Sequence, residues 1–141
     1  MASRRVLGYA AGETIRIGVI GYGGRCRALV NELLKIGGVQ LTAVCDVYEP
    51  NRQAAAQTAG ANAFVTGDHR ALLERKDVDA VLIATPDHHH VPITIDACRA
   101  GKHVYVEKPL THDLAEGKAV LAAEAESKVI VQVGMQQRSM P

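Results

Sequence analysis

Short apolar runs alternate with helix-like segments along most of this chain. There are six of these runs, and most of them are rich in valine and isoleucine and nearly continuous in apolar character. Strands that are buried on both faces, as in a parallel sheet, have this pattern. The predicted strands are 15–20, 40–45, 63–66, 80–84, 103–106 and 129–133.

Five helical segments separate the predicted strands. The predicted helices are 25–36, 50–59, a segment that begins at Asp68, a segment that follows Pro92 and ends at Gly101, and a segment that begins at Asp113. Glycines follow three of them and aspartates stand at two of the N-cap positions, with Glu116 at capping-box spacing. Repeated β-α units with short connections require parallel strands joined by right-handed crossovers. We therefore expect an α/β fold with a doubly wound (Rossmann), mostly parallel, six-stranded sheet.

Composition and charge narrow the class of protein. A chain of 141 residues with 48% apolar residues is long enough for one domain with a sizeable core. The formal net charge of +1 argues against binding to nucleic acid or to an anionic membrane through bulk charge. The cysteines at 26, 45 and 98 are far apart, which indicates reduced and mostly buried thiols.

The first residues raise the question of cellular location. Arg4 and Arg5 resemble the start of a twin-arginine export signal, but the residues that follow lack the apolar segment of such a signal. We expect residues 1–14 to be a disordered leader on a cytoplasmic protein. A shortened remnant of an export signal, with periplasmic location, is the alternative.

A glycine-rich turn, IGYGGRCR, joins the first predicted strand to the first helix. A dinucleotide site at such a turn needs a tight bend, close approach to a pyrophosphate and a helix that directs free N–H groups at it. The residues expected to contact the cofactor here are Gly21, Tyr22, Gly23, Gly24 and Arg25, with Arg25 adding charge beside the phosphates. Cys26 occupies the third glycine position, so we expect slightly looser packing of the helix on the strand.

The second predicted strand ends in an acid, Asp46, 20 positions after Cys26. A carboxylate at this place accepts hydrogen bonds from the adenosine ribose hydroxyls and repels a 2′-phosphate. The next residue, Val47, is not the arginine that would favour a 2′-phosphate. We therefore expect NAD as the cofactor, with NADP disfavoured. The alternative is an acid that only caps the following loop.

The fourth predicted strand ends in the string ATPDHHH, on the rim where ligands bind in a doubly wound sheet. Neighbouring histidines in a turn do not converge on one ion, so we expect no metal site. A solvated loop accounts for His88 and His89. His90 is the histidine that we expect in the site.

The fifth predicted strand ends on the same rim in Glu107-Lys108-Pro109. An ammonium group near a nicotinamide can bind a substrate hydroxyl and help to move its proton during hydride transfer. Lysine is also a common surface residue, but the position of Lys108 at a strand end favours the functional interpretation.

Together the strings GVIGYGGRCR, AVCDV, ATPDHHHVPI, AGKHVYVEKPL and VQVGMQQR resemble the N-terminal domain of the Gfo/Idh/MocA family of NAD(P)-dependent oxidoreductases. The resemblance implies that the glycine turn holds the pyrophosphate and that Asp46 holds the adenosine ribose. It implies contacts of Glu107 and Lys108 with the nicotinamide ribose. The residues that it places beside the nicotinamide are Thr85, Pro86 and His90. We expect Lys108 and His90 to be catalytic.

The resemblance also implies a domain organisation and an activity. Residues 15–134 correspond to the dinucleotide-binding domain, and residues 135–141 to the start of a connection to a C-terminal substrate domain that this chain lacks. We expect an NAD(H)-binding domain of an oxidoreductase that acts on CH–OH groups of sugars or polyols, inactive alone and oligomeric only with the second domain. The alternative is a non-catalytic nucleotide-binding or redox-sensing module that a partner chain completes.

Overall fold

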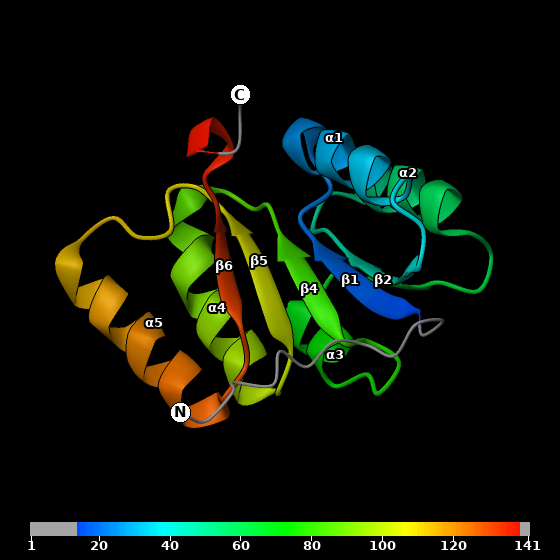
Figure 1. The fold of residues 1–141 in the computed structure, drawn as a ribbon. Helices are drawn as coiled ribbons and strands as arrows, with labels where there is room; N and C mark the ends of the chain where they lie inside the picture. Colours follow the sequence, from blue (N-terminus) through cyan, green and yellow to red (C-terminus); the bar gives the residue numbers. More distant parts are fainter. Residues whose placement is uncertain (1–13, 139–141) are drawn as a thin grey trace.

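The structure, a computed structural model, describes residues 14–138. Six strands, all parallel, form one sheet in the order β3-β2-β1-β4-β5-β6 (Figure 1). The strands are β1 (Ile15–Ile20), β2 (Val39–Cys45), β3 (Phe64–Thr66), β4 (Ala80–Ile83), β5 (His103–Glu107) and β6 (Val131–Gly134). The predicted doubly wound α/β fold is confirmed, and each strand lies within two residues of its predicted bounds at either end.

The helices connect successive strands, as the pattern predicted. They are α1 (Gly24–Leu33), α2 (Glu49–Ala59), α3 (His69–Leu73), α4 (His90–Arg99) and α5 (Leu114–Ser127), with short 3₁₀ turns η1 (Asp87–His89) and η2 (Gln136–Arg138). Helix α4 begins two residues before Pro92. A proline is tolerated there because the first-turn N–H groups of a helix have no partner within the helix.

Two apolar clusters, one on each face of the sheet, form the core. Alternate side chains of a strand point to opposite faces, so Val19 packs with α1 and α2, whereas Ile20 packs with α3 and α4. Cys26 is fully buried in the first cluster, where its thiol fills the third position of the glycine turn. Burial, and then the charge of Asp46, raises the pKa of Cys26 to about 12. All three cysteines are free and buried, as the sequence predicted.

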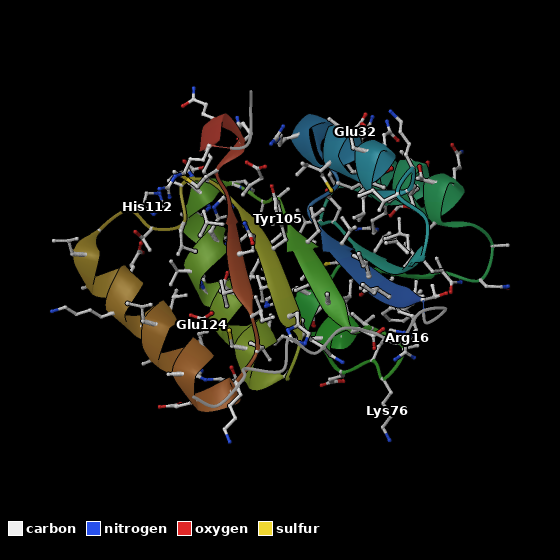
Figure 2. The ribbon with its side chains drawn as sticks, viewed as in Figure 1. Arg16, Glu32, Lys76, Tyr105, His112 and Glu124 are labelled. Atoms are coloured by element: carbon white, nitrogen blue, oxygen red, sulfur yellow. The ribbon has the colours of Figure 1, made fainter. Side chains whose placement is uncertain are left out.

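Helices α4 and α5 cover one face of β4, β5 and β6 (Figure 1). On the opposite face, β1, β4 and β5 line an apolar groove of about 340 Å³ beside α1. Tyr105 of β5 lines this groove with Leu29 and Leu33 of α1, and Figure 2 shows the tyrosine between the two elements. Burial, and then the nearby charge of Glu107, raises the pKa of Tyr105.

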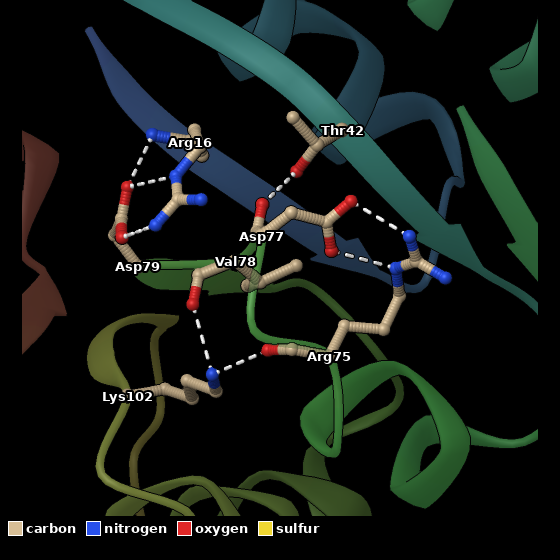
Figure 3. Close-up of polar contacts among 7 residues, drawn as sticks. All are labelled: Arg16, Thr42, Arg75, Asp77, Val78, Asp79 and Lys102. Carbon is tan, nitrogen blue, oxygen red and sulfur yellow. Dashed lines mark hydrogen bonds and ion pairs between the residues drawn. The ribbon is translucent and has the colours of Figure 1, made fainter. Parts of the chain in front are cut away.

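A cluster of polar side chains links the strands of the sheet at their amino-terminal ends (Figure 3). Arg16 of β1 makes a two-point contact with Asp79, which directly precedes β4. Lys102 donates hydrogen bonds to the carbonyl oxygens of Arg75 and Val78, at 2.6 and 2.9 Å. These contacts link the starts of β1, β4 and β5 to one another, at the opposite end of the strands from the glycine turn.

Two further observations concern the ends of the chain and membranes. The predicted leader, apart from Thr14, lies outside the described residues, as do residues 139–141. Between residues 14 and 138, no helix has both the length and the apolar character needed to cross a bilayer.

We expect Asp79→Asn to lower the free energy of unfolding at pH 7 and to reduce its loss in acid. The hydrogen bond from the Arg16 side chain lowers the pKa of Asp79 against the opposing effect of burial. The ionised carboxylate therefore stabilises the folded protein above about pH 4, and this contribution is lost as the pH falls through the lowered pKa. Urea unfolding at pH 7 and at about pH 3 measures both effects.

The exposed Glu126→Gln variant removes the same charge elsewhere and serves as the control. An identical pH dependence of stability in the wild type and in Asp79→Asn would contradict this role of the pair.

Candidate functional site

The candidate site lies at the carboxyl ends of β1, β2, β4 and β5. Strands β1 and β4 are neighbours in the sheet but not in the sequence, so their following segments diverge to opposite faces and leave a crevice. A cleft of about 550 Å³ lies here, lined by residues that include Gly21, Gly23 and Asp46. A second hollow of about 330 Å³ adjoins it at Ala84 and Thr85, which line both. Both volumes are in the range of small-molecule sites, about 300–1,000 Å³.

The glycines of the turn have different reasons to be glycine. Gly21 has φ +85°, and a Cβ on it would lie 2.8 Å from the carbonyl oxygen of Ala84. The fold itself therefore requires glycine at this position. A Cβ on Gly23 or Gly24 would meet no atom of the described chain within 4 Å. The space above these two residues is open, as close approach of a ligand to the main chain requires.

The first turn of α1 faces this open space. Its N-cap residue is Gly23, which has no side chain to accept hydrogen bonds from the free N–H groups of the turn. By contrast, Asp68 and Asp113 accept such bonds at the starts of α3 and α5. Uncapped N–H groups and the positive end of the helix dipole together favour an anion. This is the feature that a diphosphate would use.

Tyr22 stabilises the glycine turn through its buried side chain and its main-chain N–H group. Its side chain is 2% exposed and packs in the core, where its hydroxyl donates a hydrogen bond to Thr58 of α2 at 2.8 Å. Its main-chain N–H donates to Asp46 Oδ2 at 2.7 Å. The Tyr22 side chain therefore points away from the cleft, and its N–H group is already used.

Asp46 connects the end of β2 to the glycine turn. Its carboxylate accepts hydrogen bonds from the N–H groups of Tyr22 and Tyr48 and, at 3.1 Å, from the side-chain amide of Asn51. A carboxylate can accept about four hydrogen bonds, so about one position remains for a ligand hydroxyl. The loop-capping alternative and the ribose-binding interpretation are compatible in this geometry, because the same carboxylate can serve both.

Several residues at the Asp46 end of the cleft escaped the sequence reasoning. His69 and Arg70 line it from the start of α3, and both contact Asp96 of α4, at 3.0 and 3.3 Å. The position of His69 and Arg70 just after β3, on the same rim, was a usable signal. The contacts of Asp96 with these two residues depend on the packing of α4 against α3, which the sequence pattern does not specify.

His90 is the buried member of the histidine string. It is 1% exposed, whereas His88 and His89 are exposed in η1. Its Nδ1 lies 2.7 Å from the carbonyl oxygen of Pro109, and its Nε2 lies 2.9 Å from that of Thr85. Both ring nitrogens thus face carbonyl acceptors, so in this arrangement neither is available to a substrate. The ring joins the end of β4 to the segment after β5.

The end of β5 supplies the remaining predicted residues. Glu107 is 5% exposed and accepts a hydrogen bond from Arg25 Nε at 2.8 Å. Lys108 is exposed, and its ammonium has no hydrogen bond or ion pair with any residue between 14 and 138. The second hollow is lined by all three of these residues and by Thr85, Asp87, His90 and Gln136. Pro86 lines the larger cleft.

No group of three or more histidine, cysteine or acidic side chains is placed to hold a metal ion anywhere in the described range.

Asp87 and Gln136 are further residues of the second hollow that the sequence reasoning missed. Asp87 lies within the ATPDHHH string, so a signal was present, whereas the approach of Gln136 depends on how η2 folds back over the rim.

Comparison with known proteins agrees with this geometry. Residues 15–135 match the family model described as "Oxidoreductase family, NAD-binding Rossmann fold" (GFO_IDH_MocA). The chain belongs to this family. The resemblance noted in the sequence is therefore confirmed.

Relatives in the family carry two kinds of name. The chain is 41% identical over 109 residues to a glycosyl hydrolase family 109 protein of Saccharopolyspora erythraea, covering 72% of this chain and 24% of that one. It is 38% identical over 128 residues to an inositol 2-dehydrogenase/D-chiro-inositol 3-dehydrogenase of Shouchella clausii, covering 89% and 37%. The chain therefore spans about a quarter to two fifths of the length of these relatives.

Solved structures give the same picture. A scyllo-inositol dehydrogenase from Lactobacillus casei with bound NAD(H) and scyllo-inositol superposes with a TM-score of 0.82 at 28% identity. That match covers 91% of this chain and 38% of the other. A probable dehydrogenase from Thermotoga maritima gives a TM-score of 0.80 at 31% identity, covering 88% and 37%.

The residues present fit a dinucleotide. Open space over Gly23 and Gly24 admits a diphosphate, and the uncapped turn of α1 faces it. Asp46 retains an acceptor position in the larger cleft, and the Lys108 ammonium is unpaired among the described residues at the second hollow, which adjoins that cleft. These are the two places that a nucleotide and a nicotinamide half would need.

We expect alanine at Gly21 and at Gly23 to have very different effects on stability. Gly21→Ala should lower the free energy of unfolding by at least about 2 kcal/mol, because φ is positive and the new Cβ meets Ala84. Gly23→Ala should change stability by less than about 1 kcal/mol, because its Cβ enters open space. Urea unfolding followed by circular dichroism measures both, and equal losses would contradict this distinction.

We expect His90→Leu to lower the free energy of unfolding by about 2 kcal/mol, because leucine leaves at least one of the two buried carbonyl oxygens beside the ring without its hydrogen-bond donor. His88→Leu removes an exposed histidine of the same string and should change stability by less than about 0.5 kcal/mol. The same unfolding measurement decides the matter. Equal stabilities of the two variants would show that the contacts of His90 contribute nothing.

Proposed function

We propose that this chain is the NAD(H)-binding domain of an oxidoreductase that acts on CH–OH groups of sugar- or polyol-type substrates. The observation that carries the proposal is the open space over Gly23 and Gly24, in front of the uncapped turn of α1. Membership of an oxidoreductase family with an NAD-binding domain supports it. So does the structural likeness to a dehydrogenase whose structure contains NAD(H) and scyllo-inositol.

Each half of the cofactor would have its own set of residues. The N–H groups at the start of α1 would bind the diphosphate, and Asp46 would accept a hydrogen bond from the adenosine ribose. The residues on the nicotinamide side would be Thr85, Pro86, His90, Glu107 and Lys108. NAD is favoured over NADP because a 2′-phosphate would lie against the Asp46 carboxylate, with Val47 beside it in place of a basic residue.

Bound NAD⁺ would supply the acceptor for the hydride that leaves the carbinol carbon. A residue of this chain would bind the substrate hydroxyl and help to move its proton as the hydride leaves. Lys108 is suited to this, because its ammonium is exposed and unpaired among the described residues and lies beside the second hollow. His90 would hold the segment of Lys108 in place rather than exchange protons with substrate.

The names of the relatives support a second candidate, a part in glycoside hydrolysis. Glycosyl hydrolase family 109 proteins are 41% and 37% identical to this chain, and one relative at 37% is named an α-N-acetylgalactosaminidase. Both candidates are compatible with a dinucleotide site, because the family model that the chain matches is described as NAD-binding. Release of nitrophenol from an aryl α-N-acetylgalactosaminide, tested beside NADH formation from inositols, distinguishes them.

Isothermal titration calorimetry should show that the wild-type chain binds NAD at least about tenfold more tightly than NADP. Asp46→Asn should narrow this difference, because it removes the negative charge that would repel a 2′-phosphate and keeps an acceptor oxygen for the Tyr22 N–H group. Asp113→Asn, which removes the same charge at the start of α5 and still caps the helix, is the control.

Absence of any heat with NAD, together with an unchanged melting temperature in its presence, would refute the proposed function. Equal affinities for NAD and NADP in the wild type would refute only the assignment of Asp46.

A further inference from the structure

We propose that Arg25 is a positioning residue for the nicotinamide half of the site and does not bind the diphosphate. Its guanidinium holds the carboxylate of Glu107, and that carboxylate in turn holds the main chain of Lys108. The proposal rests on the proposed function, because it assigns a part of the same cofactor site.

The location of Arg25 is the first observation. It follows the two open glycines in the sequence, where a basic residue is expected to face the phosphates. Instead, its side chain lines the second hollow together with Glu107 and Lys108, and it is not among the residues that line the larger cleft with Gly21, Gly23 and Asp46. The side chain therefore reaches from the start of α1 across the rim to β5.

The contact with Glu107 is the second observation. Arg25 Nε donates to Glu107 Oε1 at 2.8 Å, and Arg25 Nη2 lies 2.8 Å from the same oxygen. The Arg25 side chain is 44% exposed, whereas that of Glu107 is 6% exposed. A carboxylate so deeply buried needs a counter-charge, because an unpaired charge in a low-dielectric environment is costly. The described part of the chain supplies Arg25 for this.

The surroundings of Glu107 leave it little freedom. Gly134 of β6 is paired with Glu107 in the sheet, and a Cβ on Gly134 would lie 3.0 Å from Glu107 Oε1. The carboxylate therefore lies over Gly134, in space that a side chain at this position would fill, and Arg25 holds it from another side. With Oε1 held in this way, Oε2 is directed at the N–H group of Lys108, at 3.2 Å.

The third observation is how Lys108 is held. Its main chain is fixed on both sides, by Glu107 at its own N–H group and by His90 at the carbonyl oxygen of Pro109. Its ammonium is unpaired within residues 14–138. These two main-chain contacts therefore set the point from which the lysine side chain, and with it the ammonium, extends. Arg25 acts through the first of them, since it orients the carboxylate that makes it.

A comparison of two ligands separates this role from phosphate binding. ADP contains the adenosine and diphosphate groups, whereas NAD also contains the nicotinamide ribose and nicotinamide. The quantity to measure by calorimetry is the ratio of the dissociation constant for ADP to that for NAD. This ratio reports the contribution of the nicotinamide half alone.

We expect Arg25→Met to weaken NAD binding roughly tenfold and to leave ADP binding within about twofold of wild type, so that the ratio falls about tenfold. Arg25→Lys keeps a cation and one donor group and should restore part of the ratio, which a purely structural defect would not predict. Arg99→Met removes the same charge from an exposed position at the end of α4 and should leave both affinities unchanged.

The double variant Arg25→Met/Glu107→Gln guards against a folding defect, because it removes the buried carboxylate together with its counter-charge. Its ratio should be no lower than that of Arg25→Met alone, since both substitutions break the same contact. Glutamine keeps an acceptor oxygen at this position, so a ratio for the double variant clearly below that for Arg25→Met alone would overturn the proposal. An equal loss of ADP and NAD affinity in Arg25→Met would also overturn it and would return Arg25 to the phosphates. A ratio near one in the wild type would do so as well, whereas a wild type that binds neither ligand would refute the proposed function itself.

Discussion

The close contact between Gly21 and the main chain at the end of β4 is the constraint on which the site depends. Gly21 has φ +85°, and a Cβ on it would lie 2.9 Å from Thr85 N. This contact brings β1 and β4 together at the point where their connections leave toward opposite faces. A crevice at the carboxyl ends of the strands follows from that divergence. The cleft is therefore a consequence of topology, and the glycine at position 21 permits the close approach of the two main-chain segments beside it.

Two carboxylates have parallel roles at the two ends of this crevice. Asp46 binds the N–H group of Tyr22 in the glycine turn, and Glu107 binds the N–H group of Lys108. Each acid therefore fixes a main-chain segment and also lines one of the two adjoining hollows. Both are aided by a side chain from outside their own strand, Asn51 for the first and Arg25 for the second. A charge that is fixed before a ligand arrives need not be ordered when it binds.

Much of the fold was predictable because periodicity and caps are local signals. Continuous apolar runs indicated buried parallel strands, and Asp68 and Asp113 were recognised as N-caps, with side chains that accept hydrogen bonds as expected. The capping box at α5 is offset by one residue, since Glu116 accepts from the N–H group of His112 and not from that of Asp113. The predicted start of α4 was wrong because of Pro92. A proline in the first turn of a helix cannot be distinguished in the sequence from a proline just before the helix.

The amino-acid sequence by itself determined the strand and helix order, the glycine turn and the acids and lysine at the strand ends. These features depend on residue types at fixed spacings along the chain, and parallel strands bring their carboxyl ends to one rim. Only the tertiary structure decided which polar groups face each other across that rim. It buried the Tyr22 side chain, placed both nitrogens of His90 on carbonyl oxygens and paired Arg25 with Glu107, 82 residues away in the sequence. The physical reason is that a long side chain at the rim can reach several partners, and the packing of neighbouring strands and helices selects among them.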